Sequence, residues 1–171
     1  MKKALNLVYL LSLSFLLNSC FWGTDPGDPS GVMPPQNYYT PIIVDRTVLE
    51  SSIGTLPAQQ IVKSGKIYIK DDLMFVNDVN KGFHVYNYSN PKNPVLIGFI
   101  KTPGATDLAI RNNLIYVNQA VDLVTIEYNP TNNTLTEKHR NKNVFPQKTA
   151  PNGQNGNGSE NEIVIDWKIN N

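Results

Sequence analysis

The stretch FHVYNYSNPKNPVLIGFI, residues 83–100, decides the fold class. Two apolar segments rich in aromatic and β-branched residues flank a turn rich in Asn and Pro, a pattern typical of paired β-strands. A looser copy follows later in the chain, where LVTIEY (123–128) precedes Asn129-Pro130 and the more polar segment TLTEKH (134–139). The sequence therefore indicates an internal repeat built from strands.

Each copy is preceded by a second related segment, KIYIKDDLMFVND (66–78) and DLAIRNNLIYVNQ (107–119). In each segment, two apolar stretches flank a polar pair, Asp71-Asp72 or Asn112-Asn113, that suits a tight hairpin turn because Asp and Asn tolerate positive φ. Aligned positions are identical at Ile69/Ile110, Leu73/Leu114, Val76/Val117 and Asn77/Asn118. We therefore predict two four-stranded units, residues 65–104 and 105–145, the strand number of a β-propeller blade.

Residues 65–130, and more loosely residues 41–64, resemble the LVIVD-repeat family of bacterial cell-envelope lipoproteins, whose members are predicted β-propellers. Leu123-Val124-Thr125-Ile126-Glu127 matches the signature strand, whereas Phe83–Asn87 departs from it, with His84 where Val is usual. The turn Ser89-Asn90-Pro91 is intact, and Glu162–Lys168 is a further candidate strand. The resemblance implies a fold and a compartment, and it implies no activity.

Two blades are too few to close a propeller. The expected fold is therefore all-β, with about two four-stranded antiparallel blades of an incomplete propeller and one short N-terminal helix. Three arrangements stay open: self-association that completes the blades, a shortened family member, or two sheets that fold alone. The sequence favours a shortened member that pairs with itself. Residues 147–160 (QKTAPNGQNGNGSE) predict a flexible loop that buries nothing.

The N-terminus, MKKALNLVYLLSLSFLLNSC, is typical of an export signal. Its apolar run, residues 4–17, would reach only roughly 21 Å as a helix, short of a bilayer core of about 30 Å. Leu17-Asn18-Ser19-Cys20 resembles a lipobox, which implies a diacylglycerol thioether on Cys20 and usually a third acyl chain, such as palmitate, on its amine. The alternative is an ordinary secretory signal. Cys20 is the only cysteine, so no disulfide within the chain is possible.

The predicted organisation is a signal peptide (1–19), a lipidated Cys20 with a Pro/Gly-rich tether (20–40), and a β-propeller-like domain (41–171). At the start of this domain we expect a strand at Ile42–Val44 and a short helix that has Asp45 as its N-cap and ends at Gly54. Without Lys2 and Lys3, 13 of the 15 basic side chains remain against 14 acidic ones, so nothing points to a nucleic-acid partner. The expected location is the cell envelope, most simply the outer membrane, through the lipid anchor.

Catalytic motifs are not evident in the sequence. His84 and His139 are the only histidines and have no evident metal-binding partners, and no cofactor is predicted. Because propeller faces are built from loops, we expect ligands at the loops around 77–82 and 118–122, contacted by Asn77, Asp78, Asn118 and Asp122. The sequence favours a non-catalytic binding or scaffolding module whose partner is an unknown protein or glycan. The alternative is a carbohydrate-binding or carbohydrate-active accessory protein, with Asp78 and Asp122 as a candidate carboxylate pair.

Overall fold

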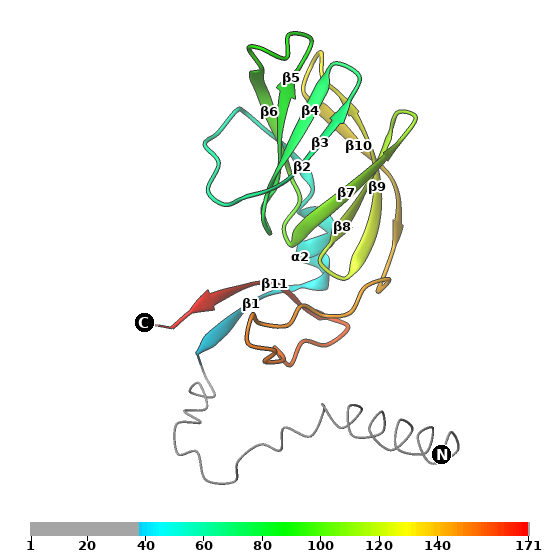
Figure 1. The fold of residues 1–171 in the computed structure, drawn as a ribbon. Helices are drawn as coiled ribbons and strands as arrows, with labels where there is room; N and C mark the ends of the chain where they lie inside the picture. Colours follow the sequence, from blue (N-terminus) through cyan, green and yellow to red (C-terminus); the bar gives the residue numbers. More distant parts are fainter. Residues whose placement is uncertain (1–37, 171) are drawn as a thin grey trace, which may run out of the picture. The chain divides into compact units, whose positions relative to one another are not determined.

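The computed structural model describes residues 38–170, and this part of the chain is all-β, as predicted (Figure 1). Its strands form three antiparallel sheets, of two, five and four strands, and none of them closes on itself. The two-stranded terminal sheet pairs β1 (Tyr39–Asp45) with β11 (Glu162–Ile169). The candidate strand at Glu162–Lys168 is therefore confirmed, and its partner comes from the other end of the described chain.

The two predicted units form two sheets of matching topology. The first sheet contains β3 (Ser64–Lys70), β4 (Leu73–Asp78), β5 (Gly82–Asn87) and β6 (Val95–Lys101). The second sheet contains β7 (Ala105–Arg111), β8 (Leu114–Gln119), β9 (Asp122–Asn129) and β10 (Thr134–Asn141). In both, each strand pairs antiparallel with the next one along the chain, so the four-stranded units are confirmed.

The predicted hairpin turns are also present. Asp71 and Asn112 have positive φ angles, 51° and 54°, and each begins the two-residue link between the first and second strands of its sheet. The first strand pair is irregular at equivalent places in the two sheets, between Ser64 and Ile67 and between Ala105 and Leu108. The repeat therefore extends to the detail of hydrogen-bond register.

The segment before the first unit differs from the prediction in three ways. Strand β1 begins at Tyr39, inside the predicted tether, and is longer than Ile42–Val44. The helix α2 (Arg46–Ser51) follows Asp45, which has the extended backbone of an N-cap, but its side chain makes no capping hydrogen bond. Gly54 does not end the helix. It begins β2 (Gly54–Leu56), which pairs with the otherwise open edge of β6 and makes the first sheet five-stranded.

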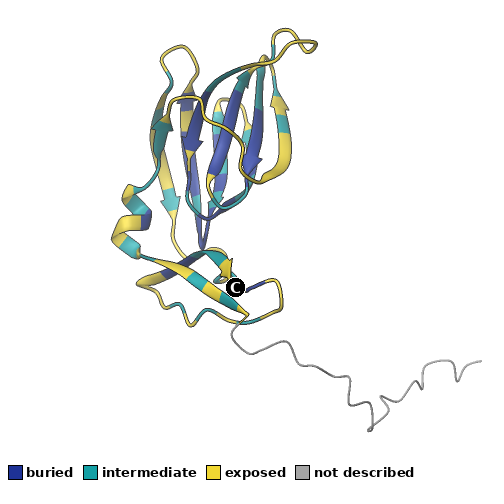
Figure 2. Cartoon of the chain, turned by 90° about the vertical axis from the view of Figure 1, so that its left-hand side faces the viewer, coloured by how far each residue is buried: buried dark blue, intermediate teal, exposed yellow. Residues whose placement is uncertain are grey.

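The main core lies between the first and second sheets. Figure 2 shows buried residues concentrated along the central strands, with exposed residues on the edge strands and loops. The buried residues of this main core come from both units: Phe75, Phe83, Val85, Ile100, Ala105, Leu108, Ile115, Val117, Val124, Ile126 and Tyr128. A smaller core of Leu49, Ala120, Val121 and Ile163 joins α2 and β11 to the loop between β8 and β9. Both units therefore belong to one packed body.

The stretch 147–160 contains no strand, but it is tied to the terminal sheet. The Gln147 side chain donates to the carbonyls of Ser159 and Glu162 (3.0 and 3.1 Å) and accepts a hydrogen bond from the Val164 N–H (3.0 Å). Ala150 is 4% exposed. The prediction that this segment buries nothing is therefore wrong at Ala150, because a side-chain amide holds the loop where apolar residues are missing.

Candidate binding cleft

The four side chains predicted to face a ligand lie at the junction between the two sheets and are largely inaccessible. Asn77, Asp78 and Asp122 have at most 1% of their surface exposed, and Asn118 is partly buried. Each has protein partners instead of open solvent. The prediction of a ligand surface at these loops is corrected here, because the loops hold the sheets together.

Asp78 fastens the link between β2 and β3 onto the first sheet. Its carboxylate accepts hydrogen bonds from the backbone N–H groups of Val62 (2.9 Å) and Lys63 (2.8 Å), and His84 Nε2 lies 3.3 Å away. Burial alone raises the pKa of the Asp78 carboxyl, but the two backbone donors and His84 outweigh it and hold that pKa below its ordinary value. His84 is fully buried against Phe99. His84 therefore packs and hydrogen-bonds inside the first sheet.

Asp122, at the start of β9, joins α2 and the end of β10. Arg46 Nη1 donates to both carboxylate oxygens (2.7 and 2.8 Å), Arg140 Nη1 to one of them (2.9 Å), and the Asn143 N–H to the other (3.0 Å). Burial alone raises the pKa of this carboxyl, but the hydrogen bonds from Arg46, Asn143 and Arg140 hold it below its ordinary value. Both carboxylate oxygens of Asp122 thus accept hydrogen bonds from donors of the same chain. Asp122 is therefore not available as half of a catalytic pair with Asp78.

The identical pair Asn77/Asn118 makes different contacts in the two sheets. Asn118 Oδ1 accepts from the N–H groups of Thr106 and Asp107 (3.0 and 2.8 Å), where β7 departs from regular pairing. Asn77 Nδ2 donates to the carbonyl of Gly82 (3.1 Å) and lies 3.4 Å from that of Ala105, the first residue of the second sheet. Both amides therefore bond to backbone at the starts of strands, but through different atoms.

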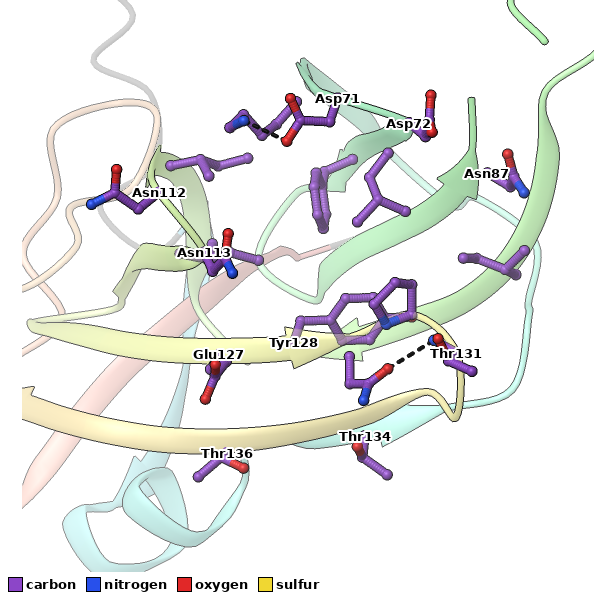
Figure 3. Close-up of a pocket in the computed structure, with 18 of the residues that line it drawn as sticks. Asp71, Asp72, Asn87, Asn112, Asn113, Glu127, Tyr128, Thr131, Thr134 and Thr136 are labelled. Carbon is purple, nitrogen blue, oxygen red and sulfur yellow. Dashed lines mark hydrogen bonds and ion pairs between the residues drawn. The ribbon is translucent and has the colours of Figure 1, made fainter. Parts of the chain in front are cut away.

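An open cleft of about 870 Å³ lies at the other end of the two sheets, between the Asp71-Asp72 turn and the Asn112-Asn113 turn (Figure 3). Its apolar lining consists of Leu73, Phe75, Ile97, Ile110, Ile115 and Tyr128. Tyr128 is held in place by an edge-to-face contact with Phe75, with ring centroids 6.5 Å apart, and by its hydroxyl, which donates to Asn133 Oδ1 (3.1 Å). The main core thus continues into the floor of the cleft.

The rim of the cleft is polar. Amides, hydroxyls and carboxylates from the turns of both sheets line it, chiefly Asp71, Asp72, Asn87, Ser89, Asn112, Asn113, Asn129 and Thr131. Within the described residues, no hydrogen bond involves the side chains of Asp72, Asn112 or Asn113, and all three are exposed. In Figure 3, Glu127 extends from the opposite side of β9 to Tyr128, where it pairs with Lys138 (2.6 Å). The rim therefore offers unpaired donors and acceptors above an apolar floor.

The remaining sequence predictions concern the N-terminal residues, a metal site and His139. Cys20, the predicted signal peptide and most of the predicted tether lie outside the described residues 38–170. Within that range, no cluster of His, Cys, Asp and Glu is arranged to hold a metal ion. No helix in the same range is long and apolar enough to cross a membrane. His139 lies exposed on β10, 2.7 Å from Asn141 Oδ1.

Comparison with known proteins adds no relative: no family model, no curated protein and no solved structure matches this chain. Function is therefore inferred from the sequence and from the geometry of the cleft. The cleft was missed by sequence reasoning because the Asp71-Asp72 and Asn112-Asn113 pairs were assigned only a turn role. Their signal was available: both pairs are polar, at equivalent repeat positions, and at the same end of their units.

Proposed function

We propose that this protein is a non-catalytic binding module, anchored to the cell envelope by a lipid on Cys20, whose ligand site is the cleft between the two sheets. The observation that carries the proposal is the unpaired polar rim, supplied by equivalent turns of two repeat units, above a floor of buried apolar side chains. Binding sites in proteins commonly combine an apolar floor with a few convergent polar groups.

The ligand class that fits this lining is a neutral, hydroxyl-rich molecule such as a segment of a glycan. Asn side chains supply both donors and acceptors, and Ser and Thr hydroxyls do the same, so they match sugar hydroxyls of either sense. Among the carboxylates that line the cleft, Asp71 and Asp72 belong to a single turn, and Asp71 is paired with Lys70. Glu127 of the second sheet also lines the cleft, but it is paired with Lys138. A glycosidase needs carboxyl groups on both sides of the scissile bond. This arrangement supports binding over hydrolysis.

The anchoring part of the proposal rests on the sequence LNSC at positions 17–20. A diacylglycerol on Cys20 would hold the module at a membrane, because two acyl chains give durable attachment where one is marginal. Mass spectrometry of the N-terminal peptide of the mature protein tests this directly. We expect Cys20 to be N-terminal and to carry the mass of a diacylglycerol; an unmodified thiol refutes the anchor.

The binding part is tested with the full chain in detergent, titrated by calorimetry with a panel of neutral and acidic envelope polysaccharide fragments. Asn113→Ala and Asp72→Ala remove exposed rim groups without a structural partner, and Asn161→Ala is the matched control, since Asn161 is also exposed but lies outside the cleft lining. A neutral hydrogen bond contributes about 0.5–1.5 kcal/mol, so each rim variant should weaken binding by up to about tenfold.

Four outcomes decide the proposal. Binding of a neutral fragment that both rim variants weaken, while Asn161→Ala does not, supports it. Binding that is equally strong in all three variants places the ligand elsewhere and refutes the cleft. Absence of binding across the panel refutes the glycan assignment, and release of shortened fragments refutes the non-catalytic assignment.

A further inference from the structure

The outer face of the first sheet, the side turned away from the second sheet, carries large apolar side chains in the open. On β3, Tyr68 points toward the second sheet and packs against the main core. Because strand side chains alternate, Ile67 and Ile69 point the other way, and they are 60% and 55% exposed. Ile67 is paired with Val76 and Ile69 with Met74, so these side chains extend a common apolar face.

The internal repeat shows that the equivalent face of the second sheet is covered. Ile67 and Ile69 align with Leu108 and Ile110 of the second sheet. Leu108 is 6% exposed, and Ile110 packs against the main core, where the first sheet covers them both. Equivalent positions of the same repeat are thus buried in one unit and open in the other.

The link between β2 and β3, residues 57–63, covers only part of the outer face. Figure 1 shows this link on the side of the first sheet that is turned away from the second sheet. Residues 58–61 border Tyr86 and Leu96 along an open groove of about 500 Å³. Ile61 and Val62 are themselves 40% and 71% exposed. The link therefore adds apolar surface to the face and leaves the β3 side uncovered.

We propose that this outer face docks onto the outer face of a second copy of the chain, in a two-fold symmetric dimer. The repeat first suggests head-to-tail stacking, in which the outer face of the second sheet would cover the face. That surface carries charge, with exposed Arg111 and with Glu127 paired to Lys138, next to the partly buried Leu114 and Tyr116. It matches Ile67 and Ile69 poorly, whereas a second outer face matches them in kind and closes the assembly at two copies.

Charge at the two ends of β3 fixes the orientation. Exposed Lys63 precedes the strand, and exposed Asp72 follows it in the turn. When two copies meet with β3 antiparallel to its counterpart, each Lys63 lies toward the Asp72 end of the other copy. The parallel alternative brings like charges together, so the antiparallel dimer is favoured.

The available area sets an upper limit on the strength of the dimer. Five strands about 4.8 Å apart and at most about 20 Å long would give a face of about 500 Å², but Val76, His84 and Phe99 on this face are already buried, so two copies together bury less than about 1,000 Å². Interfaces of this size are weak and reversible. The dimer should therefore form in a concentration-dependent way.

Light scattering of the full chain in detergent, with the detergent mass subtracted, tests the proposal. We expect the protein mass to rise toward two chains as the concentration increases. Ile67→Glu/Ile69→Glu should raise the dissociation constant by about 100-fold or more, because it places unpaired charges where apolar groups meet. Val48→Glu is the control, since Val48 is 51% exposed but lies on α2.

Circular dichroism checks that the variants keep their strand content. A chain that stays monomeric up to about 1 mM overturns the proposal, since even weak specific dimers form at that concentration. A dimer that survives Ile67→Glu/Ile69→Glu, or that Val48→Glu also disrupts, overturns it as well. As a second measurement, a photo-crosslinking amino acid at position 69 should give a product of two chains at the membrane, and the same group at position 48 should not.

Discussion

Replacing Asp122 with Asn should be among the most destabilising single changes in this protein. The Asp122 carboxylate is fully buried and accepts hydrogen bonds from two guanidinium groups, those of Arg46 and Arg140, and from the Asn143 N–H. The side chains of Arg46 and Arg140 are only 12% and 8% exposed. Asp122→Asn keeps the size of the side chain but removes the charge that both arginines face.

Breaking a buried ion pair by neutralising one partner costs about 3–5 kcal/mol, because the remaining charge stays buried without compensation. We expect about 3 kcal/mol for Asp122→Asn, since Arg140 keeps Glu137 and the Asn amide retains one acceptor oxygen. The matched control is Glu127→Gln. Glu127 pairs with Lys138 on the surface, with about half of each side chain exposed, so this change should cost at most about 1 kcal/mol.

Urea unfolding at pH 7 measures both values, and pH dependence provides a second readout. Because the pKa of Asp122 is lower in the folded state than in the unfolded state, its stabilising contribution is present above the unfolded value of about 3.9 and is lost as the pH falls through the folded value. Wild-type stability should therefore fall below about pH 4, and the fall should be shallower in Asp122→Asn. A cost under about 1 kcal/mol, equal to that of Glu127→Gln, would refute the assigned role of this ion cluster.

The remaining predictions concern the joints of the fold. Gly82→Ala should destabilise the protein by more than about 1 kcal/mol, because Gly82 has φ +147° and an added Cβ would meet the Ile100 carbonyl oxygen at 2.0 Å. Gly54→Ala is the control in the same urea assay, because the space around Gly54 is open. Equal costs for the two variants would contradict the reasoning. Asp78→Asn should expose the 57–63 link, measured as faster amide exchange at Val62 and unchanged exchange in β9; unchanged exchange at Val62 would show that the carboxylate does not hold the link.

The sequence was sufficient for the repeat because the repeat is local. Strand alternation and the positive φ at Asp71 and Asn112 depend on neighbours along the chain, and both were read from the residues. The third strand of each unit shows how the sequence could also have predicted which face of each sheet points into the core. Val85 and Ile126 are buried and point into the same core, yet they are one position apart in the repeat alignment, as expected when opposite faces of equivalent sheets meet.

The predictions that were wrong concern residues whose partners lie far away along the chain. Strand β2 follows from the open edge of β6, some forty-five residues later, and no feature of Gly54-Thr55-Leu56 specifies that pairing. The sequence predicts a loop carboxylate at Asp122, because its main partner, Arg46, is 76 residues away and no local pattern reveals the pair. The ligand surface was therefore expected at polar loops that turned out to be joints, while the open cleft formed where two short turns from different units approach each other.

Amide chemical-shift mapping of the full chain with a bound glycan fragment shows whether the cleft between the two sheets is the ligand site. We predict shifts at Asp72, Asn113 and Thr131, around the rim, with little change elsewhere. Shifts confined to the loops at 77–82 and 118–122, with the rim unaffected, would contradict it.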